Sequence, residues 1–365
     1  MKRAVIVNAK RTPIGKVNGA LRELQPQHLA APLLKQLANG VEEMLDDIII
    51  GNVVGPGGNI ARVSVLEAGL PLPIPGITID RQCSAGLEAI RMASYFIQGG
   101  AGHCYIAGGV ESTSTSPFPS RARFAPDQIG DPDMGVAAEY VAEKCRISRN
   151  MQDEYARLSY ERSWDSFHKG LIKEEIIPFS DVHFDEEFSR KRNIEALLRR
   201  ARPIFKNENG TVTAANSCGI HDGAAAVLVM EEDTANQLGM KPILRFVDSK
   251  VTGVHPHFPG FAPVPAIQAL LEGNNLTIED VDLIEINEAF SSKIVACAME
   301  LSIPYEKLNV CGGALSFGHP YAASGAILVT RLFYEVQRRN NINYVLAAIG
   351  SGGGIGVAVL FEVIS

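Results

Sequence analysis

The sequence predicts an α/β fold, and three observations lead to that class. Short apolar runs with strand character recur along the chain, amphipathic stretches of helical periodicity separate them, and glycine-rich turns mark several of the junctions. In the first third of the chain the predicted strands are 5–7, 47–50, 77–79 and 104–108, and the predicted helices include 27–37 and 87–98.

After residue 115 the composition changes, and alternating strand-like and helical segments return only near residue 211. Residues 116–133 are rich in Pro, Ser and Arg, and the stretch to about residue 205 is polar and helical. We expect an inserted subdomain at 116–209, a first half at 1–115 completed by 210–240, and a second half at 241–365. Strand character resumes at 211–219, a turn is expected at His221-Asp222-Gly223, and further strands are expected at 224–231, 347–350 and 355–362.

Two helix starts resemble each other across the halves. The segment that begins at Cys83 and the segment that begins at His319 both follow a strand-like run and open an apolar helix. Two similar halves would bring these starts, and therefore Cys83 and His319, to a shared interface.

Composition narrows the possible partners. The 365-residue chain has a formal net charge of −7, which disfavours nucleic acid or an anionic membrane as a partner. No apolar stretch approaches the roughly 20 residues that span a bilayer. The six cysteines form no CxxC pair, which argues against a zinc site and a disulfide framework. We therefore expect a cytoplasmic protein with no metal.

Cys83 is the candidate nucleophile. A cysteine at a helix N-terminus is where a thiol pKa is expected to fall, and the N–H groups of the following small residues can hold an oxyanion. An inert buried thiol is the alternative. His319, between Gly318 and Pro320, is the candidate base, although it could equally cap a turn. Asn287 and Glu288 follow a predicted strand and fit either a site or a helix cap.

Taken in order, these segments resemble the thiolase family over nearly the whole chain. The matching motifs include Gly108-Gly109-Val110-Glu111-Ser112, Asp222-Gly223-Ala224-Ala225-Ala226, Asn287-Glu288-Ala289-Phe290 and Gly318-His319-Pro320. The resemblance implies two βαβαβαββ halves in alternating helix and sheet layers, with an inserted loop domain that covers coenzyme A.

The resemblance also implies a reaction and its residues. Cys83 would be acylated by an acyl-CoA or a 3-ketoacyl-CoA, and His319 would activate it. His319 and a water held by Asn287 would bind the thioester oxygen, and the N–H groups of Cys83 and Gly352 would form a second oxyanion site. The activity would be reversible Claisen condensation and thiolysis, with coenzyme A thioesters as substrates and no cofactor.

One departure concerns proton transfer. Thiolases carry a second cysteine in a Cys-x-Gly-Gly-Gly pattern, and the aligned residue here is Gly350. General acid–base help is worth ~10²–10⁴-fold, so its loss should impair carbon–carbon chemistry. Candidate substitutes are Ser351, Cys311 and Cys297. The alternatives are an acyl-CoA hydrolase or decarboxylating condensing enzyme, and a non-catalytic acyl-CoA-binding scaffold.

Further expectations concern coenzyme A and assembly. By resemblance the coenzyme A site would include Asp133, Met134, Asp248 and Phe290, and the two aspartates would add negative charge near an anionic ligand. Basic residues in 190–192 and 199–200 could attract the phosphates, although a solvated helix face explains them as well. The segment before Met134 is shorter than in tetrameric thiolases, so we expect a homodimer.

Overall fold

The computed structural model, which describes residues 2–116, 122–179 and 181–364, contains one continuous mixed sheet. Its strand order is β4-β3-β5-β6-β1-β7-β10-β9-β8, and the short β2 pairs with β6. The strands are β1 (Ala4–Arg11), β2 (Gly15–Lys16), β3 (Asp47–Gly51), β4 (Ile77–Ile79), β5 (Cys104–Glu111), β6 (His221–Glu231), β7 (Leu244–Gly253), β8 (Leu283–Ile286), β9 (Tyr344–Ser351) and β10 (Ile355–Val363).

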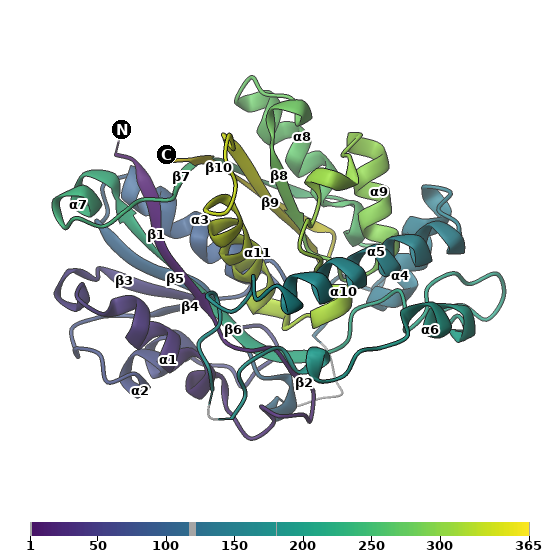
Figure 1. The fold of residues 1–365 in the computed structure, drawn as a ribbon, viewed down its shortest axis with the longest axis horizontal. Coiled ribbons are helices and arrows are strands. Elements are labelled where there is room, and N and C mark those ends of the chain that lie inside the picture. The colour runs from purple at the N-terminus through teal and green to yellow at the C-terminus, as the bar shows by residue number, and fades with distance from the viewer. Residues whose placement is uncertain (1, 117–121, 180, 365) are drawn as a thin grey trace.

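Helices surround and divide this sheet (Figure 1). They are α1 (Pro26–Ala38), α2 (Ile60–Glu67), α3 (Ala85–Gln98), α4 (Met134–Lys144), α5 (Arg149–His168), α6 (Ile194–Arg200), α7 (Glu232–Gln237), α8 (Pro263–Gly273), α9 (Ser291–Leu301), α10 (Ala314–Phe317) and α11 (Tyr321–Val336).

The sheet consists of two halves with the same internal order. In the first half β3 and β5 are parallel, and β6 and β1 follow antiparallel. In the second half β8 and β9 are parallel, and β10 and β7 follow antiparallel. The halves join where β1 meets β7 in a short antiparallel pairing at Val5–Arg245 and Ile6–Leu244. The prediction of an α/β fold of two similar halves is confirmed.

Layers of helix and sheet alternate through the molecule. Helices α3 and α11 lie in the middle and share one hydrophobic core with strands of both halves (Figure 1). Helices α1 and α2 cover the outer face of the first half, and α8 and α9 cover the outer face of the second half. This is the five-layer arrangement that the resemblance implied.

The two central helices approach each other closely at their N-terminal ends. A side chain at Gly86 would collide with the carbonyl oxygen of Ala322, so only glycine permits this approach. Residues of α3 that face the shared core, such as Leu87 and Ile90, are fully buried. The contact brings the start of α3, after Cys83, next to the start of α11, after His319.

The segment 116–209 carries α4, α5 and α6, and in Figure 1 these helices lie together beside α9 and α10. Two predictions near its end were wrong. Residues 211–219 form no strand, because their N–H groups bond to side chains of α4 and of the segment itself instead of to a neighbouring strand. His221-Asp222-Gly223 is the beginning of β6 and not a turn.

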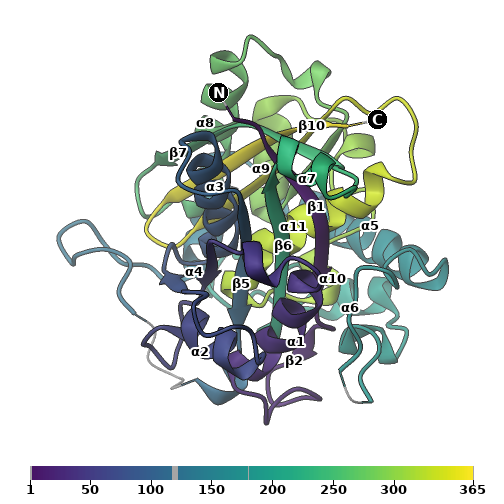
Figure 2. The ribbon, with the colours of Figure 1, turned by 90° about the vertical axis from the view of Figure 1, so that its left-hand side faces the viewer.

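The sheet ends at β4 on the side of the first half. Strand β4 lies at the edge of the sheet, four residues before Cys83. Figure 2 shows both chain ends at the same end of the molecule, away from β2 and α2. Within the described ranges, every helix is too short or too polar to cross a membrane.

Candidate active site

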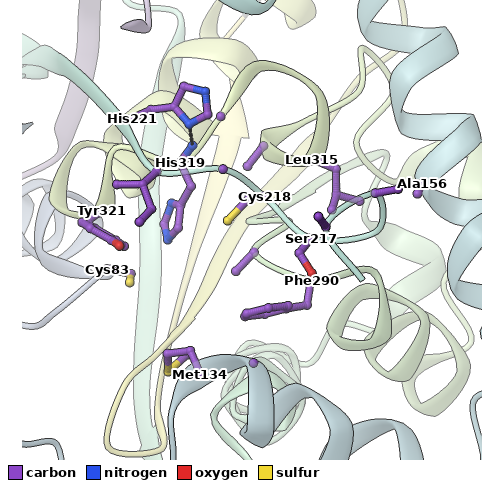
Figure 3. Close-up of a pocket in the computed structure, with 18 of the residues that line it drawn as sticks. Cys83, Met134, Ala156, Ser217, Cys218, His221, Phe290, Leu315, His319 and Tyr321 are labelled. Carbon is purple, nitrogen blue, oxygen red and sulfur yellow. Dashed lines mark hydrogen bonds between the residues drawn. The ribbon is translucent and has the colours of Figure 1, made fainter. Parts of the chain in front are cut away.

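A cavity of about 1250 Å³ opens where the two halves and the segment 116–209 meet. Its lining includes Cys83 before α3, His319 before α11, Cys218 before β6, Phe290 before α9, and Gly350 and Gly352 around the end of β9. Figure 3 shows Cys83, Cys218 and His319 around this opening. The predicted pair, Cys83 and His319, therefore faces one cavity although 235 residues separate them in the chain.

Cys83 is held by a tight turn between β4 and α3. The preceding residue, Gln82, has φ 51°, a left-handed conformation that costs energy for a residue with a side chain. Asp80 Oδ1 accepts the Gln82 N–H at 2.7 Å, and Gln82 O accepts the Ala85 N–H at 2.9 Å. This turn fixes the direction of the Cys83 side chain, which is half-buried in the cavity wall.

The thiol of Cys83 is less acidic than the sequence suggested. Burial raises its pKa to about 11, and the nearby Lys293 ammonium opposes that rise only in part. The expected lowering by the helix N-terminus was wrong for the free protein, because desolvation of a thiolate outweighs the helix dipole here. Cys83 is therefore a neutral thiol at physiological pH and needs a base.

His319 meets that need. Its pKa is lowered to about 3, first by burial and then by electrostatic interaction with Lys293 and His221. The ring is therefore neutral and has a free lone pair for a proton, although burial makes it a weaker base than imidazole in water. Nδ1 bonds to Ser324 Oγ at 2.6 Å, and the Tyr321 ring packs edge-on at 5.3 Å between centroids. With Nδ1 occupied, Nε2 is the nitrogen left for a thiol. His319 does not act as a turn cap.

Asn287 and Glu288 have different surroundings. Asn287 follows β8, is 2% exposed, and its Nδ2 has no protein partner among the described residues. A buried donor without a partner is costly, and a bound water or substrate oxygen would satisfy it. Glu288 instead accepts hydrogen bonds from Tyr155 (2.7 Å), Ser159 (2.6 Å) and Asn309 (3.0 Å). It ties the loop after β8 to α5 and accepts the backbone N–H of Leu315 in the first turn of α10, whereas the N-cap of the following helix α9 is Phe290.

Gly350 and Gly352 both line the cavity, but Gly350 leaves no room for a side chain. A Cβ built there would collide with the carbonyl oxygen of Pro259 and lie 3.0 Å from Pro263 Cδ.

The three residues considered as replacements for the missing second cysteine lie outside the cavity lining. Ser351 Oγ bonds to Ser84 Oγ, Cys311 Sγ bonds to Glu335 at 3.1 Å, and Cys297 Sγ approaches Gly260 O at 3.7 Å.

The expected coenzyme A residues divide into two groups. Asp133, Met134 and Phe290 line the cavity, together with Arg192 and Arg200 of the two basic stretches.

Asp248 is placed elsewhere. It lies on β7, where its side chain accepts hydrogen bonds from Tyr95 (2.6 Å) and Asn274 (3.3 Å), and it is absent from the cavity lining. The expectation that Asp248 contributes to the coenzyme A site is not supported. Successive side chains of a strand point to opposite faces of the sheet, and Asp248 points to the face where Tyr95 of α3 and Asn274 at the end of α8 lie.

Two residues near the site were missed from the sequence. Cys218 lines the cavity, and Lys293, which is 2% exposed, donates from Nζ to Gly350 O at 3.2 Å. Lys293 interacts electrostatically with Cys83, Cys218 and His319. A lysine in an otherwise apolar helix start was a detectable signal. Cys218 had none, since it differs from the other cysteines only in three-dimensional position.

The arrangement supports one kind of chemistry. A neutral thiol beside a neutral imidazole, in a cavity with buried donors, is suited to accept an acyl group and pass it on. The described residues contain no cluster of His, Cys, Asp or Glu that could hold a metal ion. Fold and site together define a thiol-dependent acyl-transfer enzyme.

Comparison with known proteins identifies the family. The model of the thiolase N-terminal domain matches residues 4–233, and the model of the thiolase C-terminal domain matches residues 240–363. The chain belongs to the thiolase family, and it is a thiolase-type acyltransferase.

Known proteins similar to this chain match it over its full length. YhfS of Bacillus subtilis (strain 168), provisionally named an acetyl-CoA C-acetyltransferase, is 58% identical over 362 residues, which cover 99% of this chain and 100% of that protein. VraB of Staphylococcus aureus (strain COL), with the same provisional name, is 47% identical and covers 99% of both chains. The crystal structure of the Bacillus anthracis acetyl-CoA acetyltransferase superposes with a TM-score of 0.93 at 34% identity, covering 100% of this chain and 99% of that one.

Proposed function

We propose that the chain transfers acyl groups between coenzyme A thioesters through an acyl-Cys83 intermediate, by reversible thiolysis and Claisen condensation. The observation that carries this proposal is the convergence of Cys83 and His319, one from each half of the fold, on one cavity. The provisional naming of relatives at 58% and 47% identity as acetyl-CoA C-acetyltransferases supports acetyl transfer.

In the first step His319 takes the proton of the Cys83 thiol while the sulfur attacks the acyl carbonyl. Both groups are neutral before the step, so the ion pair forms only as the reaction proceeds. The buried ammonium of Lys293 disfavours the imidazolium, so His319 returns its proton readily when the acyl group leaves.

The developing oxyanion needs donors, and the site offers two sets. The N–H groups of Cys83 and Gly352 are candidates for one set, supported by their position in the cavity wall. Asn287, whose buried Nδ2 has no protein partner among the described residues, would hold a water that acts with His319 in the other.

Coenzyme A would enter beside Asp133, Met134 and Phe290, with Arg200 available for its phosphates. Cys83, His319 and Asn287 supply the chemistry without a further cofactor.

We also propose that the chain is divided into a first half at 1–115 with 210–240, an inserted subdomain at 116–209 and a second half at 241–365. A cytoplasmic location and a homodimer remain part of the proposal. Edge strand β4 and the exposed apolar side chains of Leu66, Leu72 and Ile77 around it support the dimer.

The test is cleavage of acetoacetyl-CoA by coenzyme A, with Cys83→Ala as the blank and intact-protein mass spectrometry of the acyl-enzyme. We expect cleavage and a Cys83-linked acetyl group in the unaltered chain and neither in the variant. Acylation of Cys83 without carbon–carbon cleavage would favour the hydrolase or decarboxylating alternative, for which Gly350 is the specific reason. Absence of both acylation and coenzyme A binding would contradict an enzymatic role.

A further inference from the structure

Cleavage of a 3-ketoacyl-CoA creates a demand that Cys83 and His319 do not meet by themselves. When the bond between C2 and C3 breaks, its electron pair stays on C2, and that carbon must receive a proton. His319 has already taken the proton of Cys83. A second acid in the same cavity would therefore complete the reaction.

Most polar groups in the cavity wall are already engaged. His221 Nδ1 accepts the backbone N–H of His319 at 3.4 Å, and His221 Nε2 lies 3.3 Å from Glu187 Oε1. Ser217 Oγ donates to Thr213 O at 2.7 Å. The Tyr321 ring packs edge-on against the His319 imidazole, with 5.3 Å between the ring centroids. Gly350 has neither a proton nor space for a side chain.

Cys218 is the second thiol of the cavity. Its side chain is half-buried and lines the same opening as Cys83, as Figure 3 shows. Burial raises the pKa of Cys218 to about 12, with a further rise from Cys83, while the Lys293 charge acts in the opposite direction. Cys218 therefore holds a proton at neutral pH, and Lys293, whose own pKa is lowered by burial, interacts electrostatically with the thiolate that forms when the proton leaves.

The position of Cys218 is fixed from both sides. Its N–H donates to Ala289 O at 3.0 Å, directly beside the Asn287 loop. Upstream, the carboxylate of Glu139 accepts the N–H groups of Thr211 (2.9 Å) and Val212 (2.8 Å), and Asn216 donates to Asp153 at 2.9 Å. A loop held this firmly can present a thiol to one carbon atom of a substrate.

We infer that Cys218 is a second catalytic thiol, which gives its proton to the α-carbon of the departing thioester and recovers one from coenzyme A. This inference rests on the proposed acylation of Cys83. The Cys83 sulfur attacks C3, the C2–C3 bond breaks, and C2 takes the proton of Cys218 to give an acyl-CoA shortened by the transferred acyl group. The thiol of incoming coenzyme A then gives its proton to the Cys218 thiolate and attacks acyl-Cys83, and His319 returns its proton to Cys83.

The experiment compares two acetyl donors in single turnovers without added coenzyme A, followed by quenching and mass spectrometry of Cys83. Acetyl-CoA acetylates Cys83 without any proton transfer to carbon, whereas acetoacetyl-CoA does so only if C2 is protonated. We expect Cys218→Ala to slow acetylation from acetoacetyl-CoA by ~10²–10⁴-fold, the range of a lost general acid, and to slow acetylation from acetyl-CoA far less, because coenzyme A can leave as a thiolate whereas C2 cannot leave as a carbanion. Cys218→Ser should also be slow with acetoacetyl-CoA, because a hydroxyl is a weaker acid than a thiol.

The matched control is Cys145→Ala, which removes a half-buried thiol outside the cavity. This variant should behave like the unaltered chain with both donors.

The outcomes separate this inference from the function on which it rests. If neither donor acetylates Cys83 in the unaltered chain, the proposed function fails and the inference fails with it. If both donors work equally well in Cys218→Ala, the function stands and the role of Cys218 is refuted. Loss of the acetoacetyl-CoA reaction in Lys293→Met, with Cys218→Ala unaffected, would assign the proton to the lysine and overturn the inference.

Discussion

Burial governs the two proposed catalytic side chains more than any local sequence feature does. The Cys83 thiol is harder to ionise, and the His319 imidazole harder to protonate, than either group in water. Both changes favour the neutral pair, so the resting site is thiol plus imidazole and not thiolate plus imidazolium. A thiolate–imidazolium pair would therefore form only during the attack of Cys83 on the thioester.

This state predicts a flat pH profile. His319 is neutral above about pH 3, and Cys83 keeps its proton up to about pH 11. Lys293 and His221 face His319, and Lys293, Glu111 and Asp80 act on Cys83. The rate of Cys83 acetylation by acetyl-CoA should therefore be nearly constant from about pH 5 to about pH 9, because neither group changes protonation there. Rapid-quench mass spectrometry measures it, and a loss of rate centred near pH 6.5 would show an ordinary histidine and contradict the neutral pair.

A cysteine at position 350 should not restore a thiolase site in a simple way. The new Cβ would collide with Pro259 O, so β9 or the loop before α8 must move. We expect Gly350→Cys to lower the free energy of unfolding by about 1–3 kcal/mol, as for overpacked cores, and to gain no thiolysis activity. Denaturant unfolding and acetoacetyl-CoA cleavage check the two parts.

Gly253→Cys is the control for that change. It is also a glycine in a strand, but a Cβ there meets nothing within 4 Å, so its stability should be unchanged. Full stability of Gly350→Cys together with higher activity would show that the collision is relieved without cost.

At the scale of elements, loops clamped by buried side chains build the cavity. The loop after β8 is held by Glu288, which accepts hydrogen bonds from α5, from Asn309 and from the backbone N–H of Leu315 at 3.2 Å. The loop before β6 is held by Glu139 of α4. In both cases a buried carboxylate joins the segment 116–209 to the two halves. The part of the cavity lining that this segment contributes therefore depends on these two hydrogen-bond acceptors.

Glu288→Gln tests that dependence. The amide nitrogen of Gln cannot accept the hydrogen bonds that one carboxylate oxygen now receives, so buried donors would lose their partner. We expect the free energy of unfolding to fall by about 1–3 kcal/mol, with earlier protease cleavage in or near α5. Glu161→Gln, on the exposed side of the same helix, should have almost no effect. Equal stability of the two variants would mean that Glu288 does not hold the loop.

For the whole molecule, the two-half architecture positions the proposed catalytic residues and leaves the edge strand on which the proposed dimer depends. Each half supplies one central helix, and the site exists only where these helices meet. Among the described residues, β4 is the edge strand on the side of the first half, and its own Ile77 is 39% exposed. A second copy of the chain could extend the sheet at this edge.

We therefore expect Ile77→Lys to weaken a homodimer. A charge on β4 would have to be desolvated on pairing, so light scattering should show a shift toward monomer at low micromolar concentration. Leu238→Lys, which changes an exposed leucine next to α7, should remain dimeric. An unaltered chain that runs as a monomer, or as a stable tetramer, would contradict the dimer.

Much of this fold could be predicted from local pattern. The predicted strands at 47–50 and 77–79 match β3 and β4, and the predicted helix at 87–98 matches α3 within two residues. The failure at 211–219 has a physical cause, since alternating Thr and Val favour a strand but the N–H groups found side-chain acceptors instead. Cys83 and His319 were predictable because each follows a strand-like run and opens an apolar helix, and because their motifs resemble those of the thiolase family. Cys218 was not identified, because only its position in space links it to the site. Lys293 was also missed, although a lysine at the start of an apolar helix is visible in the sequence.

The sequence by itself determined the layered α/β class, the duplication and the two residues that face each other across it, because periodicity and glycine positions are local properties. The tertiary structure decided the rest. It decided the protonation of Cys83 and His319, because desolvation depends on every neighbour. It also decided that Asp248 lies away from the cavity, that position 350 has no room, and that a second thiol lies beside the first, because such contacts join residues far apart in the chain.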